Sequence, residues 1–170
     1  MITDYVRQGN MYCSEDGTDI TAAVAVTPYQ TDDYHEIDWQ AALKDDEVAV
    51  VHILAVNPHF RNHGCAKAMM RKVISLADSK GLKAVRLDAL ACNVPAHRLY
   101  ESLGFQKRDV RHWYAENTGW VDFLAPLCYL QVKIPPSFWK TSRSRKMLCG
   151  IHTKEQNKKV SLHSTSSPLS

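Results

Sequence analysis

A short segment of the chain combines residue types that could bind a phosphate group. It lies between an apolar run and a helical pattern and reads Arg61, Asn62, His63, Gly64, Cys65 and Ala66. The first turn of a helix presents free backbone N–H groups and the positive end of the helix dipole. Small residues at Gly64 and Ala66 would let an anion approach that backbone, and Arg61 adds a charged donor. The pattern predicts a phosphate or pyrophosphate site, with an ordinary strand-to-helix turn as the alternative.

The spacing of the glycines excludes two common phosphate-binding motifs, and a zinc site is not expected. Gly64 is the only glycine within residues 18–80, so neither a P-loop nor a dinucleotide-binding Gly-x-Gly-x-x-Gly motif is present. A zinc site built on His59, His63 and Cys65 would lack a fourth ligand. We therefore expect no metal and a ligand held mostly by backbone groups.

A buried strand and an amphipathic helix are expected to position this segment. The run Glu47–Val56 is β-branched and mostly apolar, which is typical of a strand buried on both faces. Gly81 stands where a glycine often follows the end of a helix. Between Gly64 and Lys80, apolar residues recur with helical spacing at Ala66, Met69, Met70, Val73, Ile74 and Ala77.

The remaining patterns predict an α/β or α+β sheet. Asp16-Gly17 favours a hairpin within Asn10–Gln30, and the acidic stretch Thr31–Glu47 is expected to be a surface connection with room for a short helix. The later elements are a strand at Ala84–Leu90, a helix that starts at Val94 and ends before Gly104, and strands at Phe105–Trp113 and Trp120–Lys133.

Length and composition indicate one globular domain followed by a basic tail. The chain has 170 residues, of which 45% are hydrophobic and 23% are charged. Residues 135–170 hold seven of the 21 Lys and Arg residues but only one of the 18 Asp and Glu residues. We therefore expect a domain at 1–134 and a disordered extension at 135–170. Nucleic acid is not an expected partner, apart from weak contacts of this extension.

The sequence suggests neither a membrane protein nor a secreted one. It has no run of 18 apolar residues and no N-terminal secretory signal. Its five cysteines are scattered and include no Cys-x-x-Cys pair. We expect reduced thiols and a cytoplasmic protein.

Three blocks of the sequence resemble the GCN5-related N-acetyltransferase (GNAT) superfamily. In VHILAVNPHFRNHGCAKAMM, Arg61, Gly64 and Ala66 match the family's acetyl-CoA-binding pattern of Arg or Gln, two residues, Gly, one residue, and Gly or Ala. RLDALACNVPAHRLYESLGF is similar to the following strand and helix, and HWYAENTGWVDF resembles the end strands of small bacterial-type members. The likeness covers roughly Asn10 to Gln131.

The resemblance implies an N-acetyltransferase with a mixed, mostly antiparallel sheet and flanking helices. Acetyl-CoA would be the co-substrate and an amine the acceptor. The implied cofactor contacts are the backbone of Leu54, Ala55 and Val56 along the pantetheine arm, the amides of Arg61 to Ala66 around the pyrophosphate, Asn93 on the pantetheine, and Tyr100 near the thioester sulfur.

Tyr100 is the candidate acid for this reaction. An amine acceptor with a pKa of about 10.4 must lose a proton, whereas a departing thiolate with a pKa of about 8.5 must gain one. A tyrosine with a pKa of about 10 can supply that proton, and the resemblance implies this role for Tyr100. The alternative role is packing on the apolar side of its helix.

Two residues compete for the role of base. His52 lies in the central strand, and HILAV followed by FRNHG resembles the arylalkylamine N-acetyltransferases, where a histidine deprotonates the amine through water. Asp88 stands where ribosomal-protein alanine N-acetyltransferases carry a glutamate. An imidazole suits proton transfer near neutral pH, but either residue could instead be an ordinary polar group of its strand. The sequence leaves the choice open.

The start of the chain departs from the family pattern. Complete members begin with a strand and two helices before the hairpin, whereas residues 1–46 are already accounted for by the hairpin and a connection. We therefore expect an N-terminally shortened or divergent copy. Two functions stay open: an N-acetyltransferase that works through a ternary complex, and a CoA-binding or interaction module with impaired catalysis. Such a module would be completed by a partner chain or by dimerisation, so a homodimer is one expected assembly.

Overall fold

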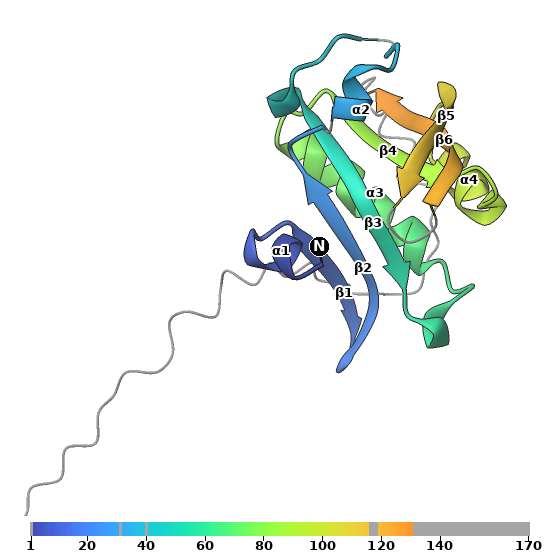
Figure 1. Ribbon diagram of the computed structural model, residues 1–170. Helices are drawn as coiled ribbons and strands as arrows, with labels where there is room; N and C mark the ends of the chain where they lie inside the picture. The colour runs from blue at the N-terminus through green and yellow to red at the C-terminus, as the bar shows by residue number, and fades with distance from the viewer. Residues whose placement is uncertain (1, 31, 40, 116–118, 131–170) are drawn as a thin grey trace, which may run out of the picture.

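The computed structural model describes residues 2–30, 32–39, 41–115 and 119–130, and its strands form one sheet (Figure 1). The order is β1-β2-β3-β4-β6-β5. The bounds are β1 Met11–Asp16, β2 Asp19–Thr27, β3 Val48–Val56, β4 Ala84–Leu90, β5 Asp109–Ala115 and β6 Gly119–Leu130. Strands β3 and β4 run parallel, and the other neighbouring pairs are antiparallel. The predicted mixed, mostly antiparallel sheet of an α/β fold is confirmed, whereas the tail expected at 135–170 lies outside the described residues.

The described helices flank this sheet. They are α1 Ile2–Arg7, α2 Asp32–His35, α3 Cys65–Ser79 and α4 Val94–Glu101, with short 3-10 turns η1 Asp45–Glu47 and η2 Pro58–Phe60. α3 and α4 confirm the two predicted helices, and α1 is an addition that the sequence pattern does not predict, because six residues are too few to show a helical period. Within the part of the chain that the structure describes, no helix is long and apolar enough to cross a membrane.

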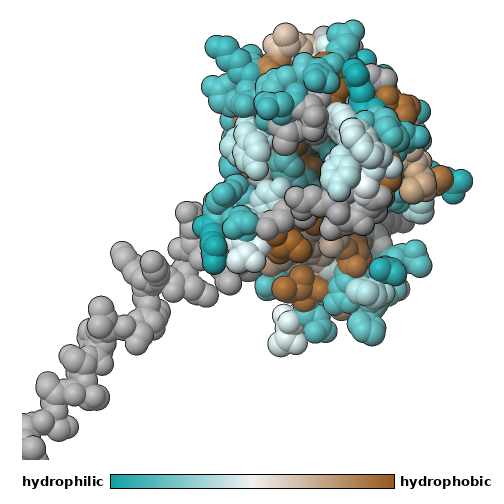
Figure 2. All heavy atoms as spheres, viewed as in Figure 1, coloured by the Kyte–Doolittle hydropathy of each residue, from teal (hydrophilic) through white to brown (hydrophobic). Residues whose placement is uncertain are grey.

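Both faces of β3 are buried, which explains its continuous apolar sequence. On one face, Ala49 and Val51 join a large cluster with the apolar side of α3. On the other face, Val48 and Val50 pack with Tyr34 of α2. Hydrophilic residues cover most of the described surface seen in Figure 2, where hydrophobic atoms form only small patches. The predicted burial is confirmed for Val48–Val51, whereas residues 52–56 are half-buried or exposed.

The connection between β2 and β3 is partly buried, which corrects the prediction of a surface segment. Within Thr31–Glu47, Tyr34 and Ile37 are only 4% and 5% exposed. Trp39 packs on the same cluster and stacks on the guanidinium group of Arg86, which lies 3.7 Å from the ring centroid. These aromatic contacts could not be predicted from the acidic sequence of the segment, because they form only when the segment packs on the folded sheet.

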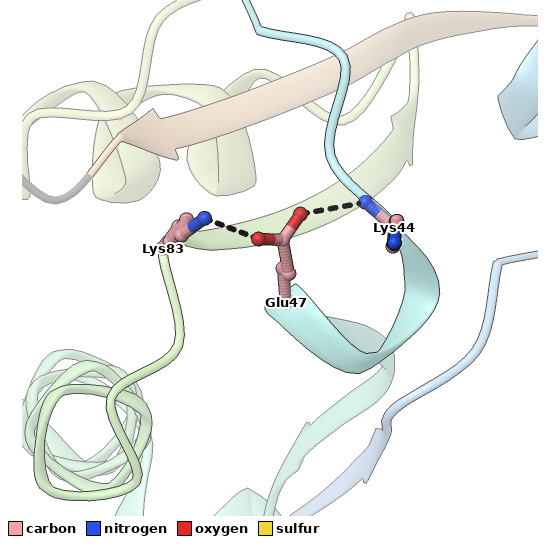
Figure 3. A network of polar contacts seen from close by, with 3 residues as sticks. All are labelled: Lys44, Glu47 and Lys83. Atoms are coloured by element: carbon pink, nitrogen blue, oxygen red, sulfur yellow. Dashed lines mark hydrogen bonds and ion pairs between the residues drawn. The ribbon is translucent and has the colours of Figure 1, made fainter.

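A polar network ties the beginnings of β3 and β4 together. Glu47 accepts a hydrogen bond from the backbone N–H of Lys44 at 3.0 Å and contacts the Lys83 ammonium group (Figure 3). The backbone N–H of Lys83 also donates to the Glu47 carbonyl oxygen at 2.7 Å. Parallel pairing joins Val48–Val51 to Ala84–Leu87 and then ends, although both strands continue. The two strands therefore diverge toward their carboxyl ends.

Candidate active site

The divergence of β3 and β4 leaves an open edge on β3. Within the described sheet, Leu54–Val56 pairs with Ala22–Val24 of β2 on one side, whereas pairing with β4 on the other side has already ended at Val51. Unpaired backbone groups of an extended strand can pair with an extended ligand. The structure thus gives Leu54, Ala55 and Val56 the geometry that the predicted pantetheine contacts require.

Asn57 fixes the turn that follows this edge. Its backbone N–H donates to the carbonyl oxygen of Thr21, and its Nδ2 donates to the carbonyl oxygen of Ile20, each at 3.0 Å. Its Oδ1 accepts from the backbone N–H of His59 at 3.1 Å. The site prediction misses Asn57, although an Asn before a Pro is a recognisable signal for the start of a helical turn.

The first turn of α3 has a backbone shape that suits an anion. Gly64 is the N-cap with a φ of +79°, and Asn62 also has a positive φ of +64°. Residues 61–64 are exposed, whereas Cys65 is buried and Ala66 is half-buried. The first N–H groups of a helix have no partners inside the helix. The segment predicted to bind the pyrophosphate, Arg61 to Ala66, therefore combines an exposed turn with donor groups at a helix N-terminus.

Asp88 of β4 lies beside two tyrosines, Tyr34 and Tyr100. Its Oδ1 accepts a hydrogen bond from the Tyr34 hydroxyl group. Burial raises the pKa of Asp88, and the bond from Tyr34 opposes that rise because it stabilises the carboxylate. Burial and the charge of Asp88 hold the pKa of Tyr34 well above its ordinary value. Asp88 is thus a carboxylate of raised basicity, next to a phenol that stays protonated.

Tyr100 of α4 combines a core position with a hydroxyl group that has no hydrogen-bond partner among the described residues. The residue is 6% exposed, and its ring centroid lies 5.8 Å from that of Phe105. No residue among those described accepts a hydrogen bond from its hydroxyl group. Burial, together with the charge of Asp88, raises the pKa of Tyr100 to about 12. The ring packs in the core, and the hydroxyl group keeps a proton that it could donate.

His52 occupies an irregular position of β3 in a separate group of side chains. A register shift between β2 and β3 leaves it as the extra residue of β3. Its Nε2 lies 2.6 Å from Oγ1 of Thr27, and the ring centroids of Tyr5 and Tyr29 lie 5.5 and 5.7 Å from its own. Thr27 Oγ1 also lies within hydrogen-bond distance, 3.2 Å, of the Tyr29 carbonyl oxygen. If the Thr27 proton goes to that carbonyl, Nε2 carries the imidazole proton and Nδ1 is the acceptor. Burial lowers the pKa of His52, so its imidazole is neutral at pH 7.

The two candidate bases stand where the parallel strands begin to diverge. His52 and Asp88 each follow the last pair of β3 and β4, which is Val51 with Leu87. The charge of Asp88 acts on Tyr100, whereas the ring contacts of His52 belong to the other group. Geometry therefore associates Asp88 with the candidate acid. In the described ranges, no group of three His, Cys, Asp or Glu side chains could hold a metal ion.

Asn93 has a local structural role at the start of α4. It is the N-cap, and its Oδ1 accepts a hydrogen bond from the backbone N–H of Ala96 at 3.3 Å. Its side chain is exposed, and an amide whose oxygen is engaged still has its N–H groups to donate. Capping and a pantetheine contact through Nδ2 are therefore compatible.

Comparison with known proteins gives a family match and partial relatives. The model of the acetyltransferase (GNAT) family matches residues 4–105. The N-acetylaspartate synthetase of Danio rerio is 42% identical over 64 residues, which are 38% of this chain and 23% of that protein. The ribosomal protein bS18-alanine N-acetyltransferase of Escherichia coli is 33% identical over 73 residues, which are 43% of this chain and 49% of that protein. Each match thus spans less than half of the relative's length.

A solved structure has the same fold at low sequence identity. The Bacillus subtilis acetyltransferase in complex with CoA superposes with a TM-score of 0.58 at 12% identity, over 77% of this chain and 82% of that chain. At this identity the likeness concerns the fold alone.

Proposed function

The chain belongs to the acetyltransferase (GNAT) family, and we propose that it transfers an acetyl group from acetyl-CoA to a primary amine. The amine would attack the thioester directly while both substrates are bound. The observation that carries the proposal is the open edge of β3, which leads through a short turn into the N-terminus of α3. This succession fits an extended pantetheine arm followed by a pyrophosphate.

The proposed cofactor contacts follow the chain from β3 to α3. The pantetheine arm would pair with the backbone of Leu54–Val56, as an added strand does. The N–H groups of Arg61–Ala66 would bind the pyrophosphate, because a helix N-terminus favours an anion. Asn93 would donate from Nδ2 to the pantetheine. The Bacillus subtilis structure with bound CoA supports this class of ligand.

Replacing Gly64 with alanine is expected to weaken CoA binding about fivefold. Alanine at this positive φ costs about 1 kcal/mol, and a turn that relaxes the strain moves the N–H groups away from the pyrophosphate. Calorimetric titration of the full chain with CoA measures the change. Gly81→Ala is the matched control, because Gly81 also has a positive φ and open space but lies beyond the other end of α3. Equal weakening by both substitutions would contradict the assigned pyrophosphate site.

The proposed reaction forms a C–N bond and breaks the C–S bond of the thioester. The amine nitrogen attacks the acetyl carbonyl carbon, and its proton passes to Asp88 or, through water, to His52. The Tyr100 hydroxyl group donates its proton to the departing CoA thiolate. Asp88 is favoured as the base because its charge acts on Tyr100 and because burial raises its pKa.

The proposed acceptor is the amino group of a small molecule or of a protein or peptide. The names of two relatives, an N-acetylaspartate synthetase and a ribosomal protein alanine N-acetyltransferase, specify acetylated amino groups of these two kinds. Free aspartate and peptides with N-terminal alanine are therefore the first acceptors to test.

Release of the CoA thiol from acetyl-CoA tests the proposed function. The full chain is incubated with acetyl-CoA and each amine of a panel, and the acetylated product is identified by mass spectrometry. Calorimetry with CoA is run in parallel. Product formation supports the acetyltransferase, whereas CoA binding without thiol release supports the alternative, a CoA-binding or interaction module with impaired catalysis. If the chain neither binds CoA nor releases the thiol, both the acetyltransferase and the binding-module hypotheses are wrong.

Location and assembly are part of the proposal. Cys13 and Cys92 are free thiols, which fits a reducing compartment such as the cytoplasm. The edge strand β5 exposes Val110 and Tyr114, and such an edge is a surface through which two copies could pair. Sedimentation of the full chain would distinguish a monomer from the proposed homodimer.

A further inference from the structure

A tyrosine that the cofactor pattern does not include makes the closest polar contact to Asp88. Tyr34 lies in α2, 54 residues before Asp88, and its hydroxyl group donates to Asp88 Oδ1. Tyr34 is 4% exposed. The bond therefore joins two groups from distant parts of the chain in a place that solvent barely reaches.

The phenol ring of Tyr34 is held on several sides. Its ring centroid lies 5.9 Å from that of Trp39 and 6.0 Å from that of Trp113, with the latter ring nearly parallel. The Trp39 indole N–H also donates to the Tyr34 carbonyl oxygen at 2.7 Å. A helix of four residues has little stability of its own. These contacts, and the bond to Asp88, therefore fix the position of the hydroxyl group.

We propose that Tyr34 is a positioning residue, whose hydroxyl group holds the Asp88 carboxylate in place to take the proton of the acceptor amine. The proposal rests on the proposed acetyltransferase function and selects Asp88 as the base. It assigns a role in the site to α2, which lies in a segment that the sequence predicts to be a surface connection with room for a short helix.

The charged and titratable groups around Asp88 come from three elements. Tyr34 faces it from α2 and Tyr100 from α4, while Arg86 lies two residues earlier in β4. His52, which follows the last paired residue of β3, has its contacts with Thr27, Tyr5 and Tyr29 instead. Burial raises the pKa of Asp88, and the Tyr34 hydrogen bond lowers it. Removing the hydroxyl group should therefore raise the pKa of Asp88 further and make the carboxylate bind its proton at a higher pH.

Tyr34→Phe tests the proposal because it removes the donor and keeps the ring contacts with Trp39 and Trp113. Tyr12→Phe is the matched control, since Tyr12 is a partly buried tyrosine that packs against the core from β1. The acidic limb of the kcat/KM profile for the amine should move to higher pH in Tyr34→Phe, with about tenfold lower activity at the acidic end. The KM for acetyl-CoA should stay near the wild-type value, and the Tm at neutral pH should fall, because the buried carboxylate of Asp88 loses a hydrogen bond. Tyr12→Phe should change none of these quantities.

A second measurement follows Asp88 without any acetyl transfer. The full chain is labelled with carboxyl-¹³C aspartate, the Asp88 signal is assigned with Asp88→Asn, and its titration is compared between wild type and Tyr34→Phe. A titration that moves to higher pH together with the activity limb supports the proposal. An unmoved titration, or a moved titration with an unmoved activity limb, overturns it. If wild type acetylates no amine, the proposed function fails, and the titration still decides whether Tyr34 holds Asp88.

Discussion

Tyr100→Phe is expected to lower kcat about 10²-fold to 10⁴-fold, the usual contribution of a general acid. The hydroxyl group has no acceptor among the described residues, whereas the ring packs against Phe105 in the core. Phenylalanine keeps this packing, so the substitution removes the proton donor and little else. The CoA thiolate would then have to leave without a proton from the protein.

The pH dependence of this loss follows from the raised pKa of Tyr100, about 12. The phenol is protonated from pH 6 to pH 10, so wild-type activity should not decline on the alkaline side through loss of this acid. The Phe variant should accordingly be slower by a similar factor at every pH in that range. Steady-state thiol release across the pH range measures both profiles.

Two controls separate this loss from unfolding. The Tm of Tyr100→Phe and its affinity for CoA should match wild type, since neither depends on the hydroxyl group. Tyr12→Phe provides a matched substitution, because Tyr12 packs against the same core cluster from β1, a strand that supplies none of the acid and base candidates. A Tyr100→Phe variant with wild-type kcat would remove Tyr100 as the acid.

The strand and helix around the open edge can be predicted from the sequence because their signals are local. β3 is a continuous apolar run, and α3 shows helical spacing that ends before Gly81. The prediction is less accurate near Phe105, which is placed in a strand, whereas the structure begins β5 at Asp109 and buries Phe105 in the core. An apolar aromatic residue fits a strand and a core-facing loop equally well, so its pattern cannot distinguish them.

Some residues of the candidate site can likewise be predicted from the sequence, whereas others cannot. Gly64 and Tyr100 belong to short motifs and can be found from sequence alone. The contact between Tyr34 and Asp88 forms only when α2 packs against the sheet. The sequence of this acidic segment contains no pattern that predicts which tyrosine is buried. The neighbours of His52 come from α1 and from the end of β2, so its environment is also a property of the fold. The roles of these residues therefore remain predictions until variants are measured.

Asp88→Asn is expected to lower kcat/KM about 10²-fold to 10⁴-fold at neutral pH and to abolish the acidic limb of the profile. Asparagine keeps the size of the side chain and an oxygen that can accept from Tyr34, but it cannot take a proton from the amine. His52→Gln should lower activity less than tenfold and keep the acidic limb, because the ring contacts of His52 lie in a separate group. The reverse result would make His52 the base.

Stability measurements distinguish this catalytic loss from a folding defect. In Asp88→Asn the activity should fall, whereas the Tm at neutral pH should not. The pKa of Asp88 is raised in the folded protein, so the folded state binds this proton more tightly than the unfolded state, where the pKa is about 3.9. The contribution of Asp88 to stability is therefore full below that value and is lost as pH rises through the folded pKa. At a pH above the folded pKa, the wild type carries the negative charge of Asp88, which burial disfavours. Asp88→Asn carries no charge at this position. The variant should have a Tm at neutral pH no lower than wild type while it is almost inactive, and a lower Tm would show that Asp88 serves the fold instead.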